Sequence, residues 1–218
     1  MARNTKSLRY SYKCKDASEG IFQNKNFNKT ESYNSSFSKS TFLNTSLVGA
    51  KFKFCNLNGV IFENCLIQGT LFRKCPFDEV KFKNCIIIST VFDRTSLKNC
   101  VIEDSIILAS SLGAGFKNSN LINSEVVKKY QDESEFNSEL IQCIEQLRGN
   151  PHINRSSILH RNKDRLNTIS IRKLLQEFRE EDLIKKLPLL GDSINKDFYT
   201  VSYIIAMLHK IGTSDRVT

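Results

Sequence analysis

The sequence predicts a repetitive solenoid followed by a small α-helical region. Three observations predict it. A large apolar residue returns every fifth position over about half of the chain, the spacing then changes to that of amphipathic helices, and no apolar run approaches the roughly 18–20 residues that cross a bilayer. A period of five fits neither a helix, with apolar residues three or four apart, nor a strand, with every second one. A fixed period sustained over this length is typical of a repeat architecture.

The five-residue series begins at Phe22 and runs to Leu112. Its nineteen positions hold ten Phe, four Leu and four Ile, and only Ser32 departs from the pattern, with Tyr33 beside it as a candidate substitute. Two positions before each stands a small or β-branched residue in every case except Lys25. One class of large side chain and one class of small side chain therefore recur in fixed phase.

This motif, a Phe or Leu with a small residue two positions before it, resembles that of the pentapeptide-repeat proteins, and the resemblance covers residues 18–127. It implies a right-handed quadrilateral parallel β-helix, a β-solenoid with four pentapeptides per coil, so that residues twenty apart stack. The central and small side chains would point inward and the other three outward. Phenylalanines such as Phe42 and Phe62 would then form ladders inside the tube.

The repeat register slips by one residue between Leu112 and Phe116, and the glycines at the slip predict a bulge or a corner. The open ends of a solenoid have to be closed against strand addition. We therefore expect residues 1–17, a basic segment, to cap one end, residues 18–127 to form the β-helix, and residues 128–218 to form a helical module.

After the repeats the spacing of apolar residues predicts three amphipathic helices. They are expected at residues 132–148, 169–187 and 196–211. Asp132 and Glu135 have the spacing of a capping box, Gly149–Pro151 is the expected end of the first helix, and Pro188 that of the second. The basic stretch 148–166 is expected to be a loop. As a whole, this half of the chain resembles no family.

The seven cysteines contain no CxxC and no Cys/His spacing suited to zinc. Five occupy the small position of the repeat: Cys55, Cys65, Cys75, Cys85 and Cys100. That phase predicts small buried packing residues rather than a metal ladder or a disulfide set, and no metal or cofactor is expected. The first residues lack the apolar centre of a secretory signal. A reducing cytoplasm is the expected location.

One predicted wall of the solenoid is apolar at positions that face outward. The residues are Leu66, Ile86, Ile88, Ile106 and Leu108. Such positions should be polar on a free rod, so the patch predicts a partner-binding interface. Its occupant is the helical region of the same chain, a second copy, or a different protein.

A second wall carries a basic ridge, the candidate site for an anion. Its residues are Lys51, Lys53, Arg73, Lys74 and Arg94. Phosphate or anionic lipid would use such a ridge. Asp93 interrupts it and Phe54 is its one aromatic stacking partner, so solvated charge is the favoured interpretation.

The segment from Arg155 to His160 resembles the Arg-x4-His signature of HEPN ribonucleases, in which the two residues act on RNA from a helical bundle. A Ser follows the Arg, where that family prefers a more polar residue, and the spacing is common by chance. Arg155 and His160 are therefore the only catalytic candidates, and an enzyme is the less favoured hypothesis.

Some pentapeptide-repeat proteins mimic DNA and protect type II topoisomerases, a role that implies an acidic rod. Here residues 18–127 carry twelve Lys and Arg against nine Asp and Glu, and the whole chain has a net charge of +9. A positive rod would be repelled by a basic DNA-binding surface. The charge thus disfavours the mimic.

The sequence favours a non-catalytic protein–protein interaction scaffold in which the helical tail caps, docks or oligomerises. The expected partner is another protein or a second copy of the chain. There is no strong nucleic-acid signal and no transmembrane segment, and association with a membrane surface is a further alternative. The runner-up, which the family resemblance implies, is a secreted bacterial effector that acts on host targets through the helical tail.

Overall fold

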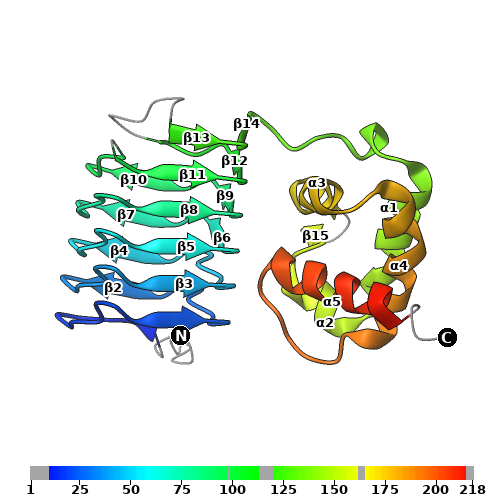
Figure 1. Ribbon diagram of the computed structural model, residues 1–218, viewed down its shortest axis with the longest axis horizontal. Helices are drawn as coiled ribbons and strands as arrows, with labels where there is room; N and C mark the ends of the chain where they lie inside the picture. The colour runs from blue at the N-terminus through cyan, green and yellow to red at the C-terminus, as the bar shows by residue number, and fades with distance from the viewer. Residues whose placement is uncertain (1–9, 98, 113–119, 162–164, 215–218) are drawn as a thin grey trace, which may run out of the picture. The chain divides into compact units, whose positions relative to one another are not determined.

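The structure, a computed structural model, describes residues 10–97, 99–112, 120–161 and 165–214. The chain divides into two compact units, Met1–Lys129 and Tyr130–Thr218. Strands make up the first unit, and helices dominate the second (Figure 1).

The first unit is a β-solenoid of about five turns, as the repeat predicts. Its strands are β1 (Ile21–Gln23), β2 (Glu31–Tyr33), β3 (Thr41–Leu43), β4 (Lys51–Lys53), β5 (Ile61–Glu63), β6 (Leu66–Gln68), β7 (Leu71–Arg73), β8 (Lys81–Lys83), β9 (Ile86–Ile88), β10 (Val91–Asp93), β11 (Val101–Glu103), β12 (Ile106–Leu108), β13 (Leu121–Ile122) and β14 (Glu125–Val127). They form three parallel sheets, in the orders β1-β3-β5-β8-β11-β13, β2-β4-β7-β10 and β6-β9-β12-β14. Strands of successive coils lie above one another (Figure 1).

The predicted stacking of residues twenty apart is confirmed, since Phe22 pairs with Phe42 and Phe42 with Phe62. The last coil is one residue shorter, because Ile102 pairs with Leu121. This agrees with the predicted slip, although residues 113–119, where the slip is expected, lie outside the described residues.

Aromatic ladders fill the tube. The rings of Phe42 and Phe62 stack with centroids 5.0 Å apart, and Phe52 and Phe72 stack at 5.4 Å. One expectation is wrong: Tyr33 does not replace the missing Phe. Ser32 itself points inward and is fully buried, while Tyr33 is 44% exposed.

The small position of the repeat serves as a hydrogen-bond donor as well as a spacer. The thiol of Cys65 donates to the carbonyl of Phe42 at 3.2 Å, and the hydroxyl of Thr45 donates to that of Phe22 at 2.7 Å. Each bond links a residue to the central residue of the preceding coil. Ser, Thr and Cys therefore suit this position because they are small and can donate.

The corners between walls need a left-handed backbone, which Asn and Gly adopt most readily. One corner stacks Asn residues at positive φ, including Asn44, Asn64 and Asn84. Another holds Phe54 (φ 57°) and Lys74 (φ 51°), residues for which this conformation is more strained.

Aromatic rings close the N-terminal end of the tube. Tyr10 stacks on Phe27 with centroids 4.9 Å apart, and Tyr12 lies edge-on to Phe37 at 5.1 Å. Residues 1–9, which the sequence assigns to the same cap, lie outside the described residues.

The second unit contains more elements than the three predicted helices. They are the 3₁₀ turns η3 (Glu133–Glu135) and η4 (Leu147–Gly149), the helices α1 (Ser138–Gln146), α2 (Pro151–Ser156), α3 (Thr168–Glu177), α4 (Glu180–Ser193) and α5 (Val201–Ser214), and the antiparallel pair β15 (His160–Arg161) and β16 (Arg165–Leu166). The expected loop at 148–166 thus contains α2, β15 and β16. Asp132 and Glu135 do form a capping box, but on η3.

The predicted helix at 169–187 is two helices. Phe178 adopts an extended backbone (φ −132°, ψ 151°) and ends α3, and α4 begins at Glu180 with three acidic residues in its first turn, which favour a helix N-terminus. Pro188 does not end α4 but lies inside it.

Candidate functional site

The aliphatic face of the solenoid is formed by the outward side chains of β6, β9 and β12. Parallel pairing aligns Leu66, Ile86 and Ile106 in one column, and Ile88 with Leu108 in the next. At β14 the first column ends, since Glu125 pairs with Ile106, whereas the second continues with Val127, which pairs with Leu108. The sequence prediction that these residues adjoin one another is therefore met by the strand register.

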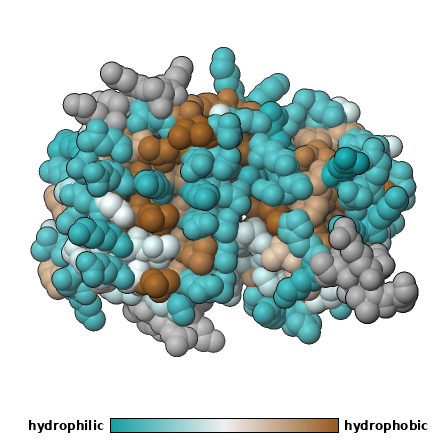
Figure 2. All heavy atoms as spheres, viewed as in Figure 1, coloured by the Kyte–Doolittle hydropathy of each residue, from teal (hydrophilic) through white to brown (hydrophobic). Residues whose placement is uncertain are grey.

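These outward side chains are buried within the chain itself. Leu66 is 8% exposed, and the others are 3% exposed or less. Outward residues of the sheet that contains β5 and β8 differ: Ile61 and Glu63 are partly exposed, and Lys81 and Lys83 are exposed. On the solenoid face seen in Figure 2, apolar residues accordingly lie among polar ones.

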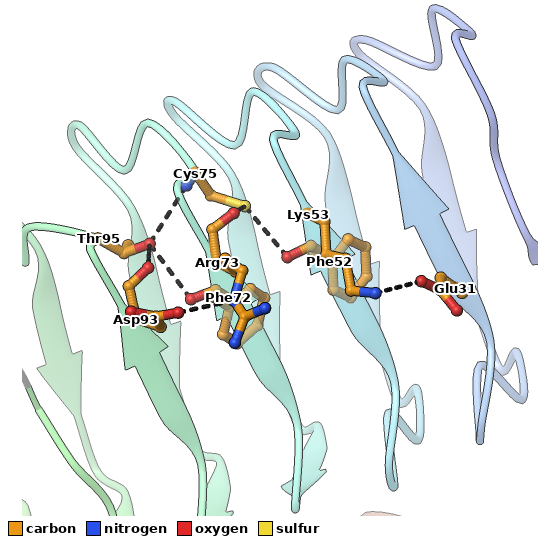
Figure 3. A network of polar contacts seen from close by, with 8 residues as sticks. All are labelled: Glu31, Phe52, Lys53, Phe72, Arg73, Cys75, Asp93 and Thr95. Carbon is orange, nitrogen blue, oxygen red and sulfur yellow. Dashed lines mark hydrogen bonds and ion pairs between the residues drawn. The ribbon is translucent and has the colours of Figure 1, made fainter.

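Ion pairs neutralise part of the predicted basic ridge. Nζ of Lys53 lies 2.5 Å from Oε1 of Glu31, a hydrogen bond that lowers the pKa of this carboxyl group. Nε of Arg73 lies 2.6 Å from Oδ2 of Asp93. Figure 3 shows both pairs joining successive coils, with the rings of Phe52 and Phe72 nearby.

The remaining cations of the ridge are Lys74, which lies beside an aromatic ring, and the exposed Lys51 and Arg94. Nζ of Lys74 lies 5.2 Å from the centroid of Phe54, a cation–π contact. Sequence reasoning missed Tyr33, whose ring lies 5.4 Å from that of Phe54 at 68°. In the sequence, the departure from the repeat at Ser32 was the signal that could have drawn attention to the exposed ring of Tyr33.

Arg155 and His160 lie in different environments. Arg155, at 63% side-chain exposure, pairs through its Nη1 with Oδ1 of Asp197 at 3.1 Å. His160 is buried, and its Nε2 lies 3.0 Å from the carbonyl of Ile144. Burial and, secondly, the charge of Arg148 lower its pKa.

The histidine that does share a partner with Arg155 is His152, whose Nδ1 lies 2.8 Å from Oδ1 of Asp197. His152 and Arg155 are three positions apart on α2, a spacing that places two side chains on one helix face. The sequence-based search missed this pair because it took the segment to be a loop.

The cysteines behave as packing residues. The five that occupy the small position are buried, and all seven are free thiols. Burial raises the pKa of Cys75 to about 12 and that of Cys100 to about 11, so both remain protonated near neutrality. Within the described residues, no group of three or more His, Cys, Asp or Glu could hold a metal ion. None of the described helices is long and apolar enough to cross a membrane.

Residues 33–64 match the family model of the pentapeptide repeats, in eight copies. The solenoid is built of pentapeptide repeats. The match runs from the last residue of β2 to the residue after β5, and the same register continues on both sides of it.

Solved structures similar to this pentapeptide-repeat solenoid include a pentapeptide repeat protein from the Arabidopsis thaliana thylakoid lumen, with 13% identity over 46% of this chain and 71% of that one, and a TM-score of 0.40. Another is HetL, involved in heterocyst differentiation regulation in Nostoc, with 9% identity over 53% and 56% of the two chains and a TM-score of 0.35. The plasmid-mediated fluoroquinolone resistance protein QnrB1 matches with 11% identity over 57% and 95%, and a TM-score of 0.28. No curated protein matches the sequence.

Proposed function

We propose that this chain is a non-catalytic interaction scaffold whose pentapeptide-repeat solenoid binds another protein molecule through its aliphatic face. The observation that carries the proposal is the aligned set of outward aliphatic residues on β6, β9 and β12, which the strand pairing brings into two adjacent columns. An aliphatic face of this kind is stable in water only when another apolar surface covers it.

The face is suited to recognition because the strands fix it before any partner arrives. Successive side chains in a column are held about 4.8 Å apart by the pairing of the coils. β-branched residues such as Ile86 and Ile106 have few accessible rotamers, so little side-chain entropy is lost on binding. Complete burial of one Leu or Ile side chain contributes about 1.5–3 kcal/mol of hydrophobic free energy to binding. The partner is therefore expected to be an apolar protein surface, on a second copy of the chain or on a different protein.

Two further features support a scaffold. Pentapeptide-repeat proteins often take part in protein interactions. The buried free thiols fit a reducing compartment such as the cytoplasm. In this proposal the helical unit caps, docks or oligomerises the scaffold.

The test compares Ile86→Glu/Ile106→Glu with a matched control, Ile61→Glu/Val101→Glu, which adds the same charges to outward apolar positions of a neighbouring sheet. Circular dichroism first establishes that each variant is folded. Light scattering then measures its mass, and affinity capture from cell lysate identifies the proteins that it binds. We expect the first variant to keep its β-sheet spectrum and to lose self-association or captured partners, while the control keeps them.

The contrary result is also informative. If the first variant unfolds and the control does not, or if mass and captured proteins are the same for both, the face packs within the chain and the proposal fails.

A further inference from the structure

The wall formed by β2, β4, β7 and β10 presents two adjacent columns along the solenoid. Strand pairing aligns Tyr33, Lys53, Arg73 and Asp93 in one column, and a bridge aligns Lys13 with Tyr33 at its start. The residues that follow them at the corner form the second column. They are Cys14, Asn34, Phe54, Lys74 and Arg94, all at positive φ.

Positive charge predominates on this surface. Its cations are Lys13, Lys51, Lys53, Arg73, Lys74 and Arg94, against the carboxylates of Glu31 and Asp93. Among the described residues, the carboxylates pair with Lys53 and Arg73, and the other four cations form no ion pair. A surplus of unpaired cations along the rod attracts a polyanion.

Exposed aromatic rings lie between these cations. Tyr33 is 44% exposed and Phe54 is 42% exposed, and their rings are in edge-to-face contact. Lys74 lies over the ring of Phe54, which leaves Tyr33 as the more open ring. Aromatic faces beside a line of cations are what proteins use to stack the bases of single-stranded nucleic acids while the cations follow the phosphates.

Phe54 occupies a left-handed corner (φ 57°), as Asn34, Lys74 and Arg94 of the same column do, and it is the one aromatic residue among them. Its ring is exposed, so it gains no core burial there.

We propose that this basic–aromatic wall binds a single-stranded nucleic acid, with a base stacked on Tyr33 and the phosphates along Lys13, Lys74 and Arg94. The columns from Lys13 to Arg94 span four coil steps, about 19 Å, enough for a few nucleotides. A duplex keeps its bases stacked inside and offers none to Tyr33. The surface is distinct from the aliphatic face of the proposed function.

The test measures the binding of a fluorescein-labelled oligothymidylate of about 20 nucleotides to the full chain by anisotropy, between about 50 and 300 mM salt. Tyr33→Ala is expected to weaken binding about tenfold without changing the salt dependence, and Tyr33→Phe to restore it. Lys74→Ala/Arg94→Ala is expected to reduce the slope of log affinity against log salt by roughly 0.7 for each phosphate that is no longer neutralised.

The matched control is Lys81→Ala/Lys83→Ala, which removes two exposed lysines from β8, on another wall. It is expected to leave the affinity almost unchanged, as is the Ile86→Glu/Ile106→Glu variant, so that this proposal and the scaffold proposal can fail separately. Heparin should compete with the oligonucleotide, and its own affinity should fall for Lys74→Ala/Arg94→Ala but not for Tyr33→Ala.

Two results would overturn the proposal. One is the absence of oligothymidylate binding at about 50 mM salt. The other is binding that Tyr33→Ala does not weaken and that the control and Lys74→Ala/Arg94→Ala weaken equally, since that shows only the attraction of a chain with net charge +9.

Discussion

The thiol of Cys143 on α1 lies 3.7 Å from the carbonyl of Ile184 on α4, to which it donates a hydrogen bond. In an uninterrupted helix the N–H four residues later would donate to this carbonyl. That residue is Pro188, which has no N–H. The thiol therefore satisfies the acceptor that proline leaves free, and this hydrogen bond helps to explain why α4 continues through Pro188.

Cys143→Ala should destabilise the helical unit by about 1 kcal/mol, because it leaves a carbonyl without its donor. Cys143→Ser should cost less, since it keeps a donor. In a Pro188→Ala background the helix supplies its own N–H, and the cost of Cys143→Ala should shrink. Urea unfolding followed by helical circular dichroism measures the double-mutant cycle. Equal costs in both backgrounds would show that the thiol only fills space.

Ser32 is the one polar residue in the central series, and its buried hydroxyl has no hydrogen-bond partner among the described residues. Ser32→Ala should raise the free energy of unfolding of the solenoid by about 1 kcal/mol, because it removes an unsatisfied polar group. Ser40→Ala is the matched control: this hydroxyl donates to the carbonyl of Ala17 at 2.8 Å, so its removal should destabilise the solenoid. Thermal unfolding of both variants checks the opposite signs.

The solenoid was predictable because each of its inward positions repeats one local requirement. A five-residue phase fixes which side chains face inward, and Phe42 and Phe62 stack as the phase predicts. The helical unit was less predictable. Its helix boundaries depend on tertiary interactions such as that of Cys143 with Ile184, which no local pattern records. The same is true of the Tyr33–Phe54 pair, since it joins positions twenty-one residues apart through the stacking of coils.

The cysteines differ in reactivity because only Cys14 is exposed. Burial raises the pKa of Cys75 to about 12, so this thiol stays protonated at pH 8 and reacts slowly. A disulfide reagent should therefore label one thiol rapidly in the folded protein and seven after unfolding. Cys14→Ser should remove the rapid phase. A rapid phase that persists in this variant would show that a buried thiol is accessible.

The helical unit should lose stability as the pH falls from about 7 towards 5, because the pKa of His160 is lowered in the folded state. Burial and Arg148 disfavour the imidazolium, while Glu145 and the carbonyl of Ile144 favour it. Protons therefore bind the unfolded chain first, below its usual pKa of about 6.5, and the destabilisation stops growing once the pH is below the folded pKa.

His160→Gln keeps a side-chain N–H for the carbonyl of Ile144 but cannot titrate. Its free energy of unfolding should therefore depend less on pH over this range than that of the wild type. Urea unfolding at several pH values measures the difference. Parallel pH profiles for the two proteins would assign the destabilisation to other groups.

Phe54→Asn should stabilise the solenoid, since Asn adopts the left-handed corner with less strain (φ 57° at Phe54). The expected gain is about 0.5–1 kcal/mol, less the small stabilisation that the cation–π interaction with Lys74 supplies. The converse variant is Asn64→Phe, which places the same side chain at a left-handed corner that now holds Asn (φ 56°). It should destabilise by more than Phe54→Asn stabilises, because Asn64 also accepts a hydrogen bond from Nδ2 of Asn84 at 2.6 Å.

Thermal unfolding measures the stability of both variants, and oligothymidylate anisotropy measures their binding. A more stable Phe54→Asn protein that binds the oligonucleotide less tightly would show that Phe54 strengthens binding while it lowers the stability of the solenoid. A variant that loses stability would show instead that the ring contributes more by packing on Tyr33 than the corner costs.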